Sequence, residues 1–347
     1  MTSSAPLRER IVPFEAGDGR PCSLVNYRRD REPHRGPVLL VHGAGTRATI
    51  FQPPATRTLV DHLVDDGYDV WNLNWRASID FPPNMWTLDQ AAVYDHPMAV
   101  RRIVAETGHD RMKAIVHCQG STSFFMAAAA GLVPEVTTIV SNAVSMHLAV
   151  PALSWWKVQV GARMTRYLTD YMNPQWGNSA PTIVAKLIDG IVRLTHHECR
   201  NAVCKHVSFT YGAGWPSLWS HDLISPETHD WIRGQFAFCP MTFFLQMARS
   251  ISAGRIVAVD GLRQLPPDVL ARRPETDARM VFLAGAASRC FLPASQTRTF
   301  EYFDRLRPNY HKLYLLPKYG HLDVFIGKDA TRDVFPIIVS ELNRQPA

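Results

Sequence analysis

No apolar stretch in this 347-residue sequence reaches the roughly 18 residues that a membrane-spanning helix needs. The first 19 residues also lack the apolar core of a secretory signal. The six cysteines stand apart, without the dense spacing of a disulfide framework. These absences favour a cytoplasmic, reducing location and argue against stable membrane insertion. With 46% hydrophobic residues, the chain can still bury a large core.

The sequence also has no dense basic block, internal repeat or low-complexity segment. Its net charge of +6 is small for this length and comes from scattered arginines. No nucleic-acid recognition motif accompanies that charge, so a nucleic-acid partner is not expected. The pattern leaves the oligomeric state open.

Strand-like and helix-like segments alternate over much of the chain. Short continuous apolar runs, typical of strands covered on both faces, are followed by helical stretches. This alternation predicts an α/β fold with a mostly parallel central sheet and helices on both faces. We expect a leading hairpin over 11–29, strands over 37–41, 68–73, 113–117, 136–142, 280–285 and 312–316, and helices over 58–65, 89–108 and 330–342.

The alternation stops after about residue 147 and resumes near residue 256. The intervening segment is rich in tryptophan, methionine, histidine and tyrosine. We interpret it as a helical cap inserted over the carboxyl ends of the strands. The predicted division is therefore core over 1–147, cap over 148–255 and core again over 256–347. The cap aromatics can form the core of the cap, line an apolar channel, or do both.

The run from Ala114 to Ser121 predicts a buried strand, a sharp turn and a helix packed by small residues. Cys118 stands at the tip of this turn, where a side chain projects above the sheet. A thiol in that position can attack a carbonyl and form a thioester, and a helix N-terminus and a histidine are expected to lower its pKa. Ser121 is the alternative nucleophile, but it lies a turn into the helix. Val116 occupies a position where such turns usually have a small residue, so the turn must be accommodated differently.

Three landmarks, His42-Gly43 after an early strand, the Cys118 turn and Gly320-His321 after the last strand, resemble the α/β-hydrolase superfamily. The resemblance implies an α/β-hydrolase fold with a helical cap. The segment 67–71 is similar to acid lipases and to hydrolases associated with cholesterol-oxidase-type enzymes. The cysteine at the turn and the run 74–76 (Asn-Trp-Arg) also resemble polyhydroxyalkanoate synthases, which carry an acyl chain on cysteine.

The resemblance implies roles for four further residues. His321 would act as general base and acid beside the thiol. The backbone N–H groups of Ala44 and Gln119 would hold the oxyanion. Asn142, at the end of the strand that follows the turn, could orient the imidazole of His321, as asparagine does in Cys-His-Asn sites.

The acid that usually orients the histidine is missing from its expected place. The loop after the strand that ends near Gly285 reads Ala-Ala-Ser-Arg, without a carboxylate. Besides Asn142, three carboxylates stay open for this role, either Asp323 close in sequence or Asp170 or Asp222 from the cap. A thiol depends less on such an acid than a hydroxyl does, because it is more acidic.

These residues predict an acyl-transfer enzyme, either an ester, thioester or lactone hydrolase or an acyltransferase. Its substrate would be a small-molecule or carrier-bound apolar acyl compound, and no cofactor is expected. The alternative is a non-catalytic ligand-binding protein on a hydrolase scaffold. A dehalogenase or epoxide hydrolase would need an aspartate where Cys118 stands.

A second group of histidines and cysteines lies within the cap segment, at His196, His197, Cys199, Cys204 and His206. Structural zinc needs four nitrogen or sulfur ligands. The two cysteines are spaced more widely than in most zinc motifs, and no second cysteine pair follows. The sequence therefore favours core packing, or a contact between Cys199 and Cys204, and no metal.

Overall fold

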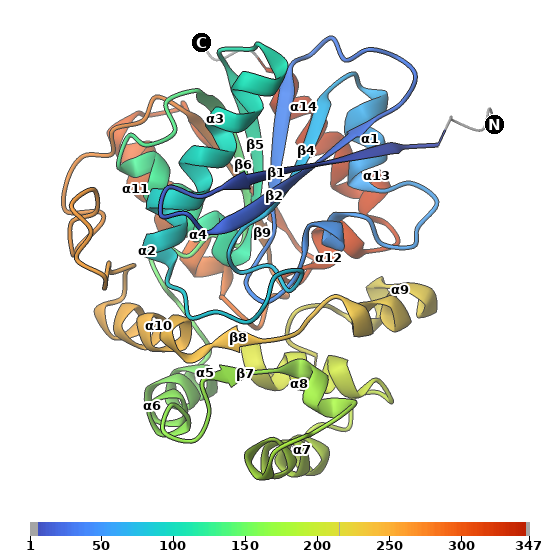
Figure 1. The fold of residues 1–347 in the computed structure, drawn as a ribbon, viewed down its shortest axis with the longest axis vertical. Coiled ribbons are helices and arrows are strands. Elements are labelled where there is room, and N and C mark those ends of the chain that lie inside the picture. The colour runs from blue at the N-terminus through green and yellow to red at the C-terminus, as the bar shows by residue number, and fades with distance from the viewer. Residues whose placement is uncertain (1–5, 215, 345–347) are drawn as a thin grey trace.

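The computed structural model describes residues 6–214 and 216–344, and its largest element is an eight-stranded sheet (Figure 1). The strands lie in the order β1-β2-β4-β3-β5-β6-β9-β10. Their bounds are β1 Arg8–Glu15, β2 Pro21–Arg28, β3 Pro37–Val41, β4 Asp69–Asn74, β5 Met112–His117, β6 Val136–Asn142, β9 Arg279–Gly285 and β10 Lys312–Leu316.

Most of this sheet is parallel, as the apolar runs predict. β1 and β2 form the expected antiparallel hairpin, and β2 also runs antiparallel to β4. Every later pairing, from β4–β3 to β9–β10, is parallel. All residues of β3, β4 and β9 are buried, because helices cover both faces of the sheet.

Figure 1 shows the sheet between two groups of helices, with α3, α4 and α11 on one side and α1, α13 and α14 on the other. The Thr58 side chain caps α1 by accepting a hydrogen bond from the N–H of Asp61, which explains where the helix begins. The bounds are α1 Leu59–Asp65, α2 Leu88–Gln90, α3 His96–Thr107, α4 Cys118–Ala129, α11 Pro293–Leu306, α12 Asp323–Ile326, α13 Ala330–Asp333 and α14 Phe335–Asn343.

Two predicted helices are interrupted. The helix expected over 89–108 contains a π-helical turn over Ala91–Asp95 between α2 and α3. The helix expected over 330–342 breaks at Val334, because Pro336 stands in the first turn of α14 and cannot continue a preceding helix. The strand predictions over 136–142 and 312–316 are confirmed at both ends.

The elements between β6 and β9 form a mostly helical layer below the sheet in Figure 1, with α7 farthest from it. Within the described residues, no helix is both long and apolar enough to span a bilayer. The helices are α5 Ala152–Trp156, α6 Arg163–Thr165, α7 Ile183–Thr195, α8 Ala202–Tyr211, α9 Pro226–Trp231 and α10 Met241–Ala253. A two-stranded ribbon of β7 Tyr171–Met172 and β8 Cys239–Pro240, a π turn over Lys157–Ala162 and short 3₁₀ turns complete this layer.

Candidate active site

The turn between β5 and α4 holds Cys118 in a strained backbone conformation. Its φ of 55° lies in the left-handed region, which few non-glycine residues adopt and which is common at functional sites. A Cβ on Gly120 would lie 2.1 Å from the carbonyl oxygen of His42, so only glycine lets α4 begin this close to the end of β3. Gly120, rather than Val116, therefore provides the close approach, and Val116 is buried within β5.

The loop after β3 brings a second backbone amide to the same point. The indole N–H of Trp75 donates a hydrogen bond of 3.0 Å to the carbonyl oxygen of His42 and fixes the start of this loop. The N–H groups of Ala44 and Gln119 both interact with the sulfur of Cys118. The structure thus brings the two amides predicted for the oxyanion hole onto the predicted nucleophile.

His321 follows β10 and lies beside the thiol. The sulfur of Cys118, a ring nitrogen of His321 and a ring nitrogen of His117 all lie within 4.8 Å of one another. The His321 ring is buried, and both its nitrogens lack a hydrogen-bond partner among the described residues. The predicted base is therefore close to the thiol, but no side chain orients its ring by a hydrogen bond.

Asn142 reaches His321 by a different route from the one expected. Its Nδ2 donates a hydrogen bond of 2.8 Å to the backbone carbonyl oxygen of His321 and another of 2.9 Å to Nδ1 of His117. Only an N–H can face that carbonyl, so Nδ1 of His117 accepts and its proton sits on Nε2. Asn142 therefore holds the backbone of the His321 loop and does not contact its imidazole, contrary to the expectation.

The candidate carboxylates also lie away from the imidazole of His321. Asp323 accepts hydrogen bonds from the N–H of Gly320 at 2.7 Å and from the N–H of Ser220 at 3.0 Å, so it joins the His321 loop to the cap. Asp170 and Asp222 are exposed. Within residues 6–214 and 216–344, the site is a thiol–imidazole pair without an orienting acid.

The alternative nucleophile, Ser121, faces elsewhere. Its hydroxyl is buried and makes a 2.6 Å hydrogen bond to the hydroxyl of Ser141 in β6. A hydroxyl held between α4 and the sheet cannot approach a substrate that rests against Cys118. The geometry therefore leaves Cys118 as the nucleophile candidate at this turn.

Burial keeps both members of the pair neutral. It raises the pKa of the Cys118 thiol to about 12, although the N–H groups of Gln119 and Ala44 oppose this effect. It lowers the pKa of His321 to about 3. The expectation of a thiol with a lowered pKa was therefore wrong, because desolvation outweighs the helix N-terminus.

Solved structures with low sequence identity share this architecture. A crystal structure from Sulfolobus solfataricus, of a protein proposed to be a lipase, is 14% identical, covers 97% of this chain and 94% of that chain, and has a TM-score of 0.58. The monoacylglycerol lipase of Paleococcus ferrophilus is 13% identical, with a TM-score of 0.52 and coverage of 96% and 98%. Residues 36–193 also match the family described as alpha/beta hydrolase fold. The chain has the α/β-hydrolase fold. The predicted fold class is confirmed.

Two curated relatives match only a short part of this chain, and a third matches most of it. Sterol esterase 2 of Saccharomyces cerevisiae is 28% identical over 112 residues, which are 29% of this chain and 21% of that protein. Lipase member K of Homo sapiens is 22% identical over 309 residues, or 80% of this chain and 71% of the human protein. Gastric triacylglycerol lipase of Rattus norvegicus is 35% identical over 103 residues, 26% of each chain. Against two of these three relatives, the match spans about a quarter or less of the relative's length.

Cys118 lies between two lobes of a cavity. The first lobe holds about 340 Å³ of empty space and includes His321, and the second holds about 500 Å³. Apolar side chains from the core and the cap line the lobes, among them Ile50, Leu218, Phe236, Val158, Phe243, Phe244, Met247 and Phe291.

Two polar groups in this cavity were missed from the sequence. The hydroxyl of Tyr211 is buried beside the thiol of Cys239, and its residue lines both lobes. The side-chain amide of Gln119 is buried without a partner among the described residues, on the second lobe. An unpaired amide is costly unless something binds it, so Gln119 is a candidate for a contact with a polar part of a ligand. In the sequence, only Gln119 could have been noticed as a cavity residue, because it directly follows Cys118 at the turn.

His117, Cys118 and His321 also have the number and type of ligands found in catalytic zinc sites. However, the positive ends of two N–H groups, from Ala44 and Gln119, point at the sulfur. Those N–H groups would stabilise the oxyanion that forms when the thiol attacks a carbonyl. The geometry therefore favours nucleophilic chemistry over metal binding at this position.

Proposed function

We propose that this protein is an ester-cleaving hydrolase of the lipase and esterase type that works through an acyl-thioenzyme on Cys118. One observation carries the proposal. The strained Cys118, two backbone N–H groups and the imidazole of His321 lie together where two apolar lobes of the cavity meet. The names of the relatives, a sterol esterase and two lipases, agree with this class of reaction.

In the first half of the proposed reaction, the sulfur of Cys118 attacks the carbonyl carbon of an ester. The thiol proton passes to a ring nitrogen of His321 as the carbon–sulfur bond forms, because both groups start neutral. The carbonyl oxygen becomes an anion held by the N–H groups of Ala44 and Gln119. Loss of one such donor costs about 3–4 kcal/mol of transition-state stabilisation in a related type of site.

In the second half, His321 gives its proton to the leaving alcohol as the carbon–oxygen bond breaks, and a thioester remains on Cys118. Water or a second alcohol then attacks the thioester with His321 again as base, which restores the thiol. The missing acid is compatible with this scheme, since a thiol needs less help than a hydroxyl to lose its proton. Transfer to an alcohol and hydrolysis differ only in this last acceptor.

The cavity predicts a preference for esters with an apolar acyl chain of medium length or longer. We expect hydrolysis of p-nitrophenyl esters to become more efficient from acetate to octanoate, because each methylene buried in the second lobe contributes about 0.8 kcal/mol. The measurement is kcat/KM across the series. If no ester gives turnover or a covalent adduct, and a fatty-acid ligand still binds, the protein is a binding module on a hydrolase scaffold instead.

The cap also exposes an unusual number of large apolar side chains. Along α7, Ile183, Leu187, Ile191 and Leu194 are exposed on one face, with Leu194 at 79%. A groove continues this surface from α7 toward α5 and the π turn that follows α5. Ile191 and residues of these two elements line the groove. We call this surface the apolar cap face, and its exposed members are Leu153, Trp155, Trp156, Val160, Met164, Tyr167, Leu168, Ile183, Leu187, Ile191 and Leu194.

Within the proposed function, we assign this face to an anionic lipid surface that supplies the ester. The segment 152–195 contains five lysines and arginines and two aspartates, which suits a negatively charged surface.

The double variant Leu187→Asp/Leu194→Asp should lose sedimentation with phosphatidylglycerol vesicles and keep its activity on soluble p-nitrophenyl butyrate. Ile11→Asp, at an exposed residue of β1, is the matched control and should sediment normally. Sedimentation unchanged in the double variant, or self-association through this face in size-exclusion chromatography, would rule out the lipid assignment.

A further inference from the structure

The histidines and cysteines of the cap do not assemble as their order in the sequence suggested. His206 makes a 3.0 Å contact with Asp189 through Nε2, and His196 lies beside the hydroxyl of Thr195. His197 is exposed. None of these three histidines belongs to the group of side chains that surrounds the two cysteines.

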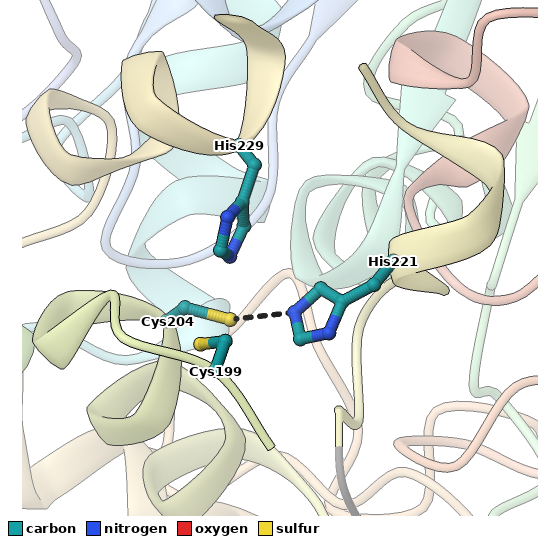
Figure 2. A group of neighbouring side chains, drawn as sticks. All are labelled: Cys199, Cys204, His221 and His229. Carbon is teal, nitrogen blue, oxygen red and sulfur yellow. Dashed lines mark hydrogen bonds between the residues drawn. The ribbon is translucent and has the colours of Figure 1, made fainter. Parts of the chain in front are cut away.

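A different cluster forms instead, with two histidines from farther along the chain. Cys199, Cys204, His221 and His229 each place one ligand atom within 4.8 Å of all the others. Figure 2 shows the two imidazoles and the two thiols pointing toward a common centre, with Cys199 and Cys204 from one segment and the histidines from two others. The sulfur of Cys204 lies 3.4 Å from Nε2 of His221, and the sulfur of Cys199 interacts with the rings of both His221 and His229.

These distances match one coordination geometry. In a tetrahedral zinc site, bond lengths of about 2.3 Å to sulfur and about 2.0–2.1 Å to nitrogen place a sulfur and a nitrogen ligand about 3.5 Å apart. The 3.4 Å between Cys204 and His221 is close to this separation. Two thiolates and two neutral imidazoles also neutralise a divalent cation, which suits a group that is half-buried around the buried Cys204.

The surrounding structure holds the four side chains in place. Asn201 accepts a hydrogen bond from the N–H of Cys204 at 3.1 Å and donates one of 2.6 Å to the carbonyl oxygen of His229. The backbone carbonyl oxygen of Asn201 lies 3.6 Å from the sulfur of Cys199. The buried indole N–H of Trp219 interacts with the sulfur of Cys204. One buried asparagine thus fixes three of the four members, and an N–H donor faces a sulfur, as in the outer shells of metal sites.

We infer that Cys199, Cys204, His221 and His229 bind one zinc ion in a closed, structural site. Four protein ligands leave no open position for a substrate, so the ion would support the fold and take no part in the reaction. It would join the start of α8 to α9 and close the segment 205–220 into a loop. That segment carries Tyr211 and Leu218, which line the cavity beside Cys118.

Metal content tests this inference independently of any activity. The full chain, purified from cells grown with zinc, should contain about one zinc per molecule by elemental analysis, and an organomercurial should release it by displacing the thiolates. Protein refolded with cobalt should show the intense visible absorption of tetrahedral cobalt and a thiolate charge-transfer band. Cys199→Ser and His229→Asn should each lose most of the bound zinc and the charge-transfer band should weaken in Cys199→Ser.

His197→Asn is the matched control, because this exposed histidine lies two residues from Cys199 and outside the cluster. It should keep the full zinc content. The inference fails if wild-type protein binds no zinc or cobalt after refolding with either metal, since that measurement needs no variant. It also fails if intact mass shows Cys199 and Cys204 joined as a disulfide in protein purified under reducing conditions, or if Cys199→Ser and His229→Asn keep their zinc.

Discussion

Cys118→Ala should remove the covalent acyl intermediate and reduce turnover of p-nitrophenyl butyrate by about 10⁴-fold or more, as loss of the nucleophile does in triad hydrolases. The reason is that the other candidates are engaged elsewhere. The hydroxyl of Ser121 is bound to Ser141, and the thiol of Cys290, which also lines the cavity, lies 3.0 Å from the backbone carbonyl oxygen of Tyr211. Intact-protein mass spectrometry during turnover should show one acyl group on wild-type protein and none on the variant.

Two controls make this result specific to Cys118. Cys22→Ala changes a buried thiol in β2, remote from the cavity, and should still be acylated once. Cys118→Ser should also be strongly impaired, because a hydroxyl beside a histidine without an orienting acid is poorly activated. An acyl group that persists on Cys118→Ala would exclude the thiol as the nucleophile.

The same thiol should show no plateau of reactivity near neutral pH. Burial raises the pKa of Cys118 to about 12 and lowers that of His321 to about 3, so neither group titrates between these values. Alkylation of Cys118 by iodoacetamide should keep rising with pH as long as the protein stays folded. A plateau above pH 6 would instead indicate a thiolate–imidazolium pair.

The fold could be predicted from the sequence because its signals are local. The apolar runs that became β3 and β9 are continuous, and such runs occur in strands that are covered on both faces. The turn at Cys118 also lies within one short segment, and Gly120 marks it. The interruption at Val334 was missed, although Pro336 stands in the sequence, because the surrounding apolar pattern continues through it.

The contacts of the site could not be predicted in the same way, because they join distant segments. Asn142 could be placed near His321 from the strand order, but its contact with a backbone carbonyl depends on the path of the loop after β10. The four-residue cluster in the cap is a sharper example, since His221 and His229 follow Cys204 by 17 and 25 positions. The sequence analysis considered only the histidines next to the cysteines and favoured packing over a metal, and the side chain of one of them, His206, contacts Asp189.

Arg76→Ala should lower the free energy of unfolding by about 3–5 kcal/mol, the cost typical of leaving one member of a buried ion pair without its partner. The Arg76 guanidinium is 3% exposed and lies 2.6 Å from Oδ1 of Asp95, which is fully buried in the π turn before α3. It also lies 2.9 Å from Asp18 in the turn of the leading hairpin. One side chain therefore joins the end of β4 to two other segments. Urea unfolding followed by circular dichroism measures the loss.

The decrease in the free energy of unfolding caused by Arg76→Ala should also depend on pH. Burial raises the pKa of Asp95 above its unfolded value near 4, and without Arg76 it would rise further. A carboxyl whose pKa is raised by folding stabilises the folded state below its unfolded pKa, and this stabilisation is lost as the pH rises through the folded value. The deficit of Arg76→Ala should therefore be larger at pH 8 than at pH 5, and Asp95→Asn should restore part of it. Arg332→Ala breaks an exposed pair with Asp333 and should leave the free energy of unfolding nearly unchanged at either pH. A deficit for Arg76→Ala as small as that of Arg332→Ala would show that Asp95 is solvated once its partner is gone.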